Sequence, residues 1–150
     1  MQVQKNIRTE VQNIGGACNN SPSAPEASEL VNEAEEALKY SRPLYSGFRV
    51  GAAVLGSSGK IYRGANFENL SLSMSLCAEK LAILKALSEG EEEIKAIAIV
   101  SGNEEFCLPC GSCRQFIFEF APQASIFVSG REGIKKYSIL ELLPEAFKIK

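Results

Sequence analysis

Three cysteines and one glutamate form the pattern in this sequence that is best suited to chemistry. Cys77 stands two residues before Glu79, and Pro109 precedes the pair Cys110 and Cys113. A C-x-x-C pair alone also occurs in redox sites and structural zinc knuckles, but an upstream Cys-x-Glu makes the combination typical of a catalytic zinc site. We therefore predict that the three cysteines bind one zinc ion, with Glu79 beside it as the catalytic acid and base.

The chemistry of such a site explains each part of the pattern. Three protein ligands leave a fourth tetrahedral position, at which zinc acidifies a water molecule into a nucleophile near neutral pH. Glu79 can accept the proton of this water, protonate a ring nitrogen of the substrate, and deliver a proton to departing ammonia. The pattern thus predicts hydrolytic removal of an amino group from a heterocyclic base.

Three thiolates give the zinc centre a net charge of about −1, which weakens its acidifying power relative to a site that contains a neutral imidazole. The sequence contains no histidine. Lys80 and Arg114 each directly follow a ligand motif. We expect these two cations to compensate the thiolate charge through hydrogen bonds to sulfur.

Other uses of the same thiols stay open at this point. Cys107 extends the series to Cys107-x-x-Cys110-x-x-Cys113 and could close the site as a fourth ligand, which would make the zinc structural. An iron–sulfur cluster could use the same four thiols, but Glu79 would then have no role. Cysteines that act only as small buried hydrophobes are disfavoured by these spacings.

Composition limits the class of protein. A chain of 150 residues with 45% hydrophobic residues is long enough for one sizeable core. Its net charge of −2 gives no general attraction to phosphate backbones, so a small substrate is favoured over nucleic acid. No apolar run approaches the roughly 20 residues that span a bilayer, and five cysteines, an odd number, fit a reducing compartment. We expect no membrane association and a cytoplasmic location.

Hydrophobic periodicity predicts the elements that position these residues. Residues 1–24 are polar, and we expect a mobile N-terminal arm there, followed by a catalytic domain over residues 25–150. The expected helices begin at Pro25, at Ala78, after Pro109 and at Ser138, and the expected strands cover residues 50–55, 60–65, 94–100 and 125–128. The three glutamates at 91–93 are expected to form a solvated loop.

This order of elements predicts an α/β fold, a three-layer α/β/α sandwich with a mixed sheet. Both cysteine motifs then lie at helix starts. The positive end of a helix dipole stabilises a nearby anion by roughly 0.3–1 kcal/mol, which favours thiolate over thiol.

From Tyr40 to Phe147 the chain resembles the small homotetrameric cytidine deaminases. The resemblance rests on the sequences YSGFRVGAA (45–53), NFEN (66–69), CAE (77–79), ALSEG (86–90), PCGSCRQ (109–115) and ELLP (141–144). It implies a cytidine deaminase-like fold, a homotetramer, and zinc-dependent hydrolysis of cytidine and deoxycytidine to uridine and deoxyuridine in pyrimidine salvage.

The resemblance also implies substrate contacts. Asn66 and Glu68 would hydrogen-bond the ribose hydroxyls, and Phe48 would lie against the pyrimidine ring unless it is a core aromatic. Ala78 would offer backbone groups to the base, and Phe147 would either reach into a neighbouring subunit's site or anchor the tail as a hydrophobe.

Two departures from the family pattern affect activity and substrate preference. Lys80 stands where three-cysteine relatives usually have arginine, so a point charge replaces a fork of donors. Leu70 stands where relatives have a small residue. The alternatives kept are a deaminase of another cytosine nucleoside, such as blasticidin S, and a catalytically silent zinc-stapled domain.

Overall fold

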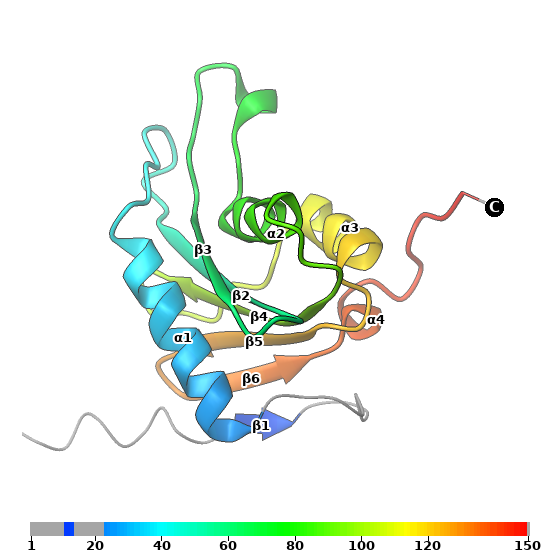
Figure 1. Ribbon diagram of the computed structural model, residues 1–150. Helices are drawn as coiled ribbons and strands as arrows, with labels where there is room; N and C mark the ends of the chain where they lie inside the picture. The colour runs from blue at the N-terminus through cyan, green and yellow to red at the C-terminus, as the bar shows by residue number, and fades with distance from the viewer. Residues whose placement is uncertain (1–10, 14–22, 150) are drawn as a thin grey trace, which may run out of the picture.

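A six-stranded mixed sheet lies between helices in the computed structural model, which describes residues 11–13 and 23–149. Its strands are β1 (Val11–Asn13), β2 (Val50–Gly56), β3 (Ile61–Ala65), β4 (Ile94–Ser101), β5 (Ser125–Gly130) and β6 (Gly133–Tyr137), in the spatial order β1-β6-β5-β4-β2-β3. Helix α1 (Ala24–Leu38) covers one face, and α2 (Ala78–Ser88) and α3 (Gly111–Phe120) cover the other (Figure 1). Two short helices, η2 (Leu72–Met74) and α4 (Ile139–Leu142), complete the described fold. The predicted α/β/α sandwich is confirmed.

Strand β4 lies inside the sheet because its side chains are apolar on both faces. Ile97 and Ile99 belong to the core under α2 and α3, whereas Ala96 and Ala98 belong to the core under α1. A strand that is covered by helices on both sides needs this nearly continuous apolar run. Within the described residues, no helix has the length and hydrophobicity needed to cross a membrane.

Two glycines let helices approach the sheet closely, one on each face. A Cβ built on Gly51 would overlap the Ala34 carbonyl oxygen of α1 and lie 2.8 Å from the backbone nitrogen of Leu38. A Cβ built on Gly64 of β3 would overlap the Ala78 carbonyl oxygen and lie 2.6 Å from the backbone nitrogen of Ala82. The start of α2, which carries the predicted catalytic glutamate, therefore rests directly on strand backbone.

Two strands were not predicted from the sequence. Strand β1 lies within the segment expected to be a mobile arm and pairs in parallel with β6, while residues 1–10 and 14–22 lie outside the described residues. Strand β6, which contains Lys135 and Lys136, pairs antiparallel with β5. Neither strand has a strong apolar pattern, because β1 is a three-residue edge strand and β6, between β1 and β5, carries two lysines. Short strands and lysines are common at the edges of sheets.

The expectation of a solvated loop at residues 91–93 is wrong for Glu91, which is only 8% exposed. Its carboxylate accepts hydrogen bonds from the Ser57 hydroxyl at 3.1 Å, the Ser58 amide at 3.0 Å, the Ser58 hydroxyl and the Tyr62 hydroxyl at 3.0 Å. These bonds, those from Ser58 foremost, lower the pKa of Glu91 to about 2. Glu91 thus ties the β2–β3 hairpin to the loop after α2.

Glu91→Gln should destabilise the fold at neutral pH and have a smaller effect in acid. Because the pKa of Glu91 falls from an ordinary value of 4.5 to about 2 on folding, its ionised form contributes stability fully above pH 4.5. That contribution is lost as the pH falls from 4.5 through about 2. Urea unfolding midpoints of wild type and variant, measured from pH 7 down to pH 3, should therefore converge.

Glu92→Gln is the matched control for this experiment, because Glu92 is the exposed neighbour in the same loop. Its midpoint should stay close to that of the wild type throughout. A gap between Glu91→Gln and wild type that stays constant across the pH range would contradict the ionic role of Glu91.

Candidate functional site

The predicted metal ligands lie at the starts of two neighbouring helices. Cys77 is the N-cap residue of α2, and Cys110 is the N-cap residue of α3, with Cys113 in the first turn of α3. Both N-cap residues have extended backbone, so each chain segment turns into its helix at the cysteine itself. The positive ends of two helix dipoles therefore meet at the three sulfurs and favour their thiolate forms.

The three sulfurs are close enough to share one ion. All three lie within 4.8 Å of one another, and the Sγ atoms of Cys77 and Cys110 are 4.0 Å apart. Thiolates about 2.3 Å from a tetrahedral zinc ion are about 3.8 Å from each other, so this donor set fits zinc in both chemistry and spacing. Cys113 is buried, Cys77 is half-buried and Cys110 is exposed, which leaves one side of the cluster open.

Cys107 does not belong to this cluster. Among the described residues, the group of side chains that could hold a metal has three members, Cys77, Cys110 and Cys113. The Cys107 side chain packs instead against the core under α2 and α3. Burial, with added effects of nearby negative groups, raises the pKa of the Cys107 thiol to about 11, which keeps it protonated at neutral pH. This geometry favours an open site over the closed four-cysteine alternative.

The thiols of Cys77 and Cys113 are close enough for each to affect the ionisation of the other. A hydrogen bond with the Cys113 thiol is the main cause that lowers the pKa of Cys77 to about 6, and the positive charge of Lys80 adds to the effect. The same hydrogen bond raises the pKa of Cys113. The first proton is therefore lost from this pair readily, as a metal-binding thiol requires.

Lys80 and Arg114 bond to oxygen atoms in the structure, whereas we expected them to bond to sulfur. The Lys80 Nζ donates to the Ser112 Oγ at 2.6 Å, which links the start of α2 to the start of α3. The Arg114 guanidinium donates to the carbonyl oxygens of Pro109 at 2.8 Å and Leu142 at 2.9 Å. Both cations thus brace the turns that present the sulfurs.

Glu79 lies in the first turn of α2 and is only 4% exposed. Burial raises the pKa of Glu79 to about 7, and the negative charge of Cys77 adds to the shift. A carboxyl group with a pKa near the working pH can both accept and donate protons. The Glu79 carboxyl group lies next to the cluster, since both the charge of Cys77 and a hydrogen bond with Cys113 act on its pKa.

Asn66 is buried and bonded within the protein. Its Oδ1 accepts hydrogen bonds from the Ser41 hydroxyl at 2.5 Å and the Val50 amide at 2.9 Å, and its Nδ2 donates to the Phe48 carbonyl oxygen at 2.8 Å. The family resemblance implied a sugar contact for this residue. The structure gives Asn66 an additional role, which is to fix the chain that carries Phe48.

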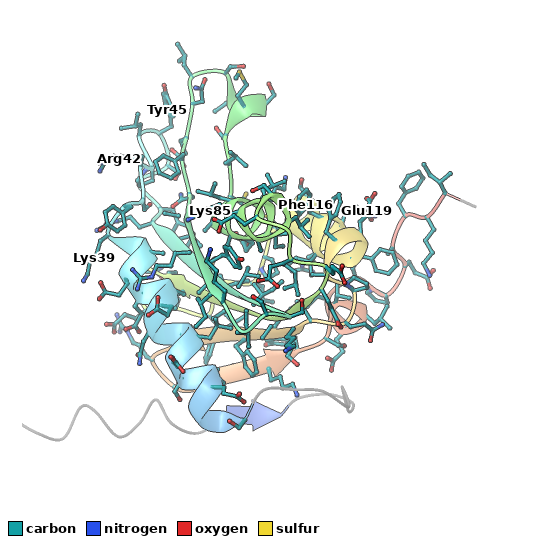
Figure 2. All side chains as sticks on the ribbon, in the orientation of Figure 1. Lys39, Arg42, Tyr45, Lys85, Phe116 and Glu119 are labelled. Atoms are coloured by element: carbon teal, nitrogen blue, oxygen red, sulfur yellow. The ribbon has the colours of Figure 1, made fainter. Side chains whose placement is uncertain are left out.

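Glu68 is likewise held by the loop before β2, on which Figure 2 shows Arg42 and Tyr45. Its Oε2 accepts hydrogen bonds from the Tyr45 amide at 2.7 Å and the Ser46 amide at 2.9 Å, and its Oε1 accepts one from the Ser46 hydroxyl. Ser46, which sequence reasoning did not single out, is therefore bonded to one of the predicted site residues. Only its place in the motif at residues 45–53 could have suggested it.

The remaining predicted substrate contacts differ in exposure. Phe48 is 41% exposed, which disfavours the alternative of a core aromatic. Ala78 is fully buried at the start of α2. Phe147 is 71% exposed, and its backbone nitrogen and oxygen pair with the Gln115 side-chain amide at 3.1 and 3.0 Å. The tail is therefore held here by this amide, and Phe147 is left largely exposed.

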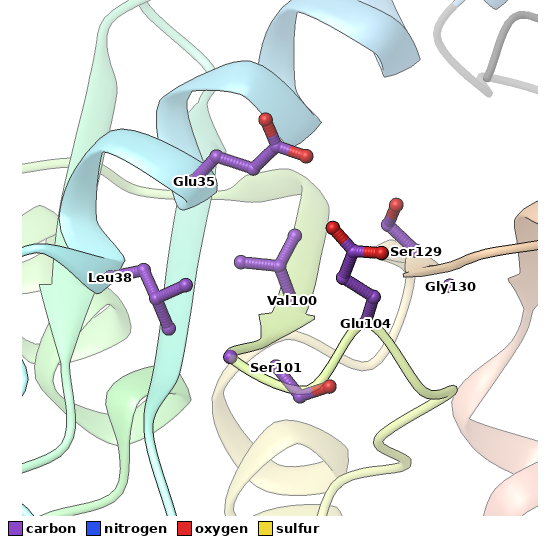
Figure 3. Close-up of a pocket in the computed structure, with 8 residues that line it drawn as sticks. Glu35, Leu38, Val100, Ser101, Glu104, Ser129 and Gly130 are labelled. Carbon is purple, nitrogen blue, oxygen red and sulfur yellow. The ribbon is translucent and has the colours of Figure 1, made fainter. Parts of the chain in front are cut away.

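A separate pocket of about 220 Å³ lies on the α1 side of the sheet, at the ends of β4 and β5. Figure 3 shows the carboxylates of Glu35 and Glu104 in this pocket, together with the hydroxyl of Ser129. The predicted ligands and Glu79 are not among its lining residues, since α2 and α3 cover the opposite face. This pocket is distinct from the sulfur cluster.

Comparison with known proteins gives one consistent result. Residues 25–129 match the family model described as the cytidine and deoxycytidylate deaminase zinc-binding region. The chain is 41% identical to a cytidine deaminase of Halalkalibacterium halodurans over 120 residues, which is 79% of this chain and 91% of the relative. A probable cytidine deaminase of Dictyostelium discoideum is 40% identical over 81% of this chain and 84% of its own.

Solved structures agree with the sequence matches. The cytidine deaminase of Burkholderia pseudomallei superposes with a TM-score of 0.75 at 34% identity, covering 80% of this chain and 98% of that chain. The cytidine deaminase of Mycobacterium tuberculosis superposes with a TM-score of 0.72 at 32% identity, covering 81% of this chain and 97% of that chain. The fold and the zinc-binding region are thus shared with these proteins.

The purified chain should contain about one zinc ion. Cys113→Ser should reduce zinc affinity by more than the roughly 10–100-fold that is typical of losing an outer-shell partner, because it removes a ligand atom itself. Cys107→Ser is the matched control and should retain the metal. Elemental analysis of both variants measures this, with circular dichroism to confirm folding. Loss of zinc from folded Cys107→Ser would show a four-cysteine site.

Proposed function

Because the chain belongs to the cytidine and deoxycytidylate deaminase family, we propose that it hydrolyses cytidine and deoxycytidine to uridine and deoxyuridine, with release of ammonia. The observation that carries this proposal is the three-cysteine cluster at two helix starts with buried Glu79 beside it. The free thiols of all three cysteines suit a reducing compartment, and we place the activity in cytoplasmic pyrimidine salvage.

Cys77, Cys110 and Cys113 are the residues that would hold the zinc ion. When bound, zinc lowers the pKa of a water molecule so that it can act as a nucleophile near neutral pH. The cysteines supply charge and geometry for this. The bond between Lys80 and Ser112 and the two bonds of Arg114 keep the ligand turns in register.

Glu79 is proposed to carry the protons of the reaction. It accepts the first proton of the attacking water and donates it to the ring nitrogen of cytosine. It then accepts the proton of the new hydroxyl on the ring carbon and delivers it to the amino group, which leaves as ammonia. Its burial excludes bulk water as a competing proton donor. Because Glu79 lies in the first turn of α2, two residues after the N-cap Cys77, the same helix start positions both the proton carrier and a metal ligand.

The remaining residues of the site would bind the nucleoside. We propose that Phe48 packs against the flat pyrimidine ring, that the backbone at Ala78 meets the base, and that Asn66 and Glu68 meet the sugar hydroxyls. Two observations support this assignment. Phe48 is exposed, and hydrogen bonds to the loop before β2 hold Asn66 and Glu68 in place. A net charge of −2 gives no reason to expect a nucleic-acid substrate.

We further propose that the chain forms a homotetramer. The segment between β3 and α2 projects from the body of the protein (Figure 1), and it exposes Leu70 by 81%, Leu72 by 72% and Met74 by 69%. Apolar side chains this exposed commonly mark protein contacts. Light scattering of the purified protein should give four times the chain mass, and a monomer would contradict the assembly.

Glu79→Gln should abolish turnover without removing zinc. The amide keeps the shape of the side chain but cannot shuttle protons, and positioned proton transfer contributes typically 10²–10⁴-fold to the rate. We therefore expect kcat for cytidine to fall by at least about 100-fold. The loss of cytidine absorbance in the ultraviolet measures turnover, and elemental analysis measures zinc.

Glu119→Gln makes the same chemical change at an exposed position on α3 (Figure 2) and should retain full activity. Zinc-loaded wild-type protein that turns over no cytosine nucleoside would contradict the proposed function. Near-normal turnover by Glu79→Gln would contradict the role of Glu79.

A further inference from the structure

The loop between α1 and β2 is joined by its backbone to the segment after β3. The Arg42 amide donates to the Asn66 carbonyl oxygen at 2.9 Å, and the Glu68 amide donates to the Arg42 carbonyl oxygen at 3.1 Å. The first segment carries Phe48, and the second carries Asn66 and Glu68. The base-binding and sugar-binding parts of the proposed site are thus joined by backbone hydrogen bonds between these two segments.

Ser46 contacts both parts with one side chain. Its hydroxyl donates to Glu68 Oε1 and accepts from the Phe48 amide at 3.0 Å, while its own amide donates to Glu68 Oε2 at 2.9 Å. A relay therefore runs from the Phe48 N–H through the Ser46 hydroxyl to the Glu68 carboxylate. Such chained bonds polarise and strengthen one another.

The bonds that Glu68 receives also determine how it can serve a ligand. A carboxylate offers about four lone-pair sites, and here the Tyr45 amide, the Ser46 amide and the Ser46 hydroxyl use three of them. These bonds, foremost that from the Ser46 hydroxyl, lower the pKa of Glu68. Glu68 is thereby kept ionised and fixed, with limited remaining capacity to accept a hydroxyl.

We propose that Ser46 is a positioning residue for sugar recognition, which sets the orientation of Glu68 toward a sugar hydroxyl of the nucleoside. This inference rests on the proposed function of the same site. Ser46 acts through Glu68 and not through Phe48, because the Phe48 carbonyl oxygen is separately bonded to Asn66 Nδ2 at 2.8 Å. Loss of the Ser46 hydroxyl therefore removes the donor to Glu68 Oε1 and leaves only the two amide bonds to Oε2, while the Phe48 carbonyl oxygen stays bonded to Asn66.

Ser46→Ala tests this inference with two substrates, cytidine and 2′,3′-dideoxycytidine, which lacks the sugar-ring hydroxyls. Losing one charge-assisted hydrogen bond that orients Glu68 should raise KM for cytidine by roughly tenfold, with kcat changed by less than about twofold. For dideoxycytidine the variant should match the wild type. Ser46→Thr keeps a hydroxyl at the position and should restore the wild-type KM.

Two further variants separate positioning from general damage. Ser88→Ala removes a hydroxyl that bonds the Lys85 carbonyl oxygen at the far end of α2, and it should leave both kinetic constants unchanged. In a Glu68→Gln background, Ser46→Ala should have little further effect, because the partner through which it acts is already altered. Additive losses in the double variant would overturn the inference.

The remaining outcomes are also decisive. An unchanged KM for cytidine in Ser46→Ala, or an equal loss with both substrates, would overturn the role of Ser46 while wild-type turnover upholds the proposed function. Wild-type protein that neither deaminates cytidine nor binds uridine in calorimetry would overturn the proposed function itself, and this inference with it.

Discussion

The convergence of two helix starts is the constraint on which the rest of this structure depends. Three sulfurs must lie within a few ångströms of one another, and they come from segments that are more than thirty residues apart in the chain. The sheet solves this by supporting α2 and α3 side by side on one face, with Cys77 and Cys110 at their first positions. Because the dipoles of both helices point their positive ends at the cluster, the backbone favours the thiolates that binding a metal requires.

The cations near the sulfur cluster act both through their charge and through hydrogen bonds that hold the ends of the helices together. Lys80 contributes to the low pKa of Cys77 and also bonds Ser112, so the cation that compensates a thiolate also links the two helices. Arg114 holds the turn before α3 and the end of α4 through carbonyl oxygens. Lys80, which stands after Cys-Ala-Glu in place of arginine, thus still links α2 to α3, although it offers a single ammonium group.

The sequence allowed the layers, most strands and the cysteine cluster to be predicted, because hydrophobic periodicity and ligand spacing are local properties. It did not indicate β1 or β6, since β1 has only three residues and β6 contains two adjacent lysines, so neither shows a run of apolar side chains. It also missed the burial of Glu91, because a run of three glutamates looks solvated until the hydroxyl donors of a distant hairpin are known. Ser46 escaped notice for the same reason: its partners are brought to it by tertiary structure.

Gly64 has no side chain, and this allows the first turn of α2 to pack directly against the backbone of strand β3. A side chain at this position would push against the backbone of that turn, which carries Cys77 and Glu79, the proposed metal ligand and proton carrier. The distance between the two halves of the centre is therefore encoded in part by a residue that contacts neither metal nor substrate. A substitution of Gly64 is therefore expected to lower zinc content even though Cys77, Cys110 and Cys113 are all unchanged.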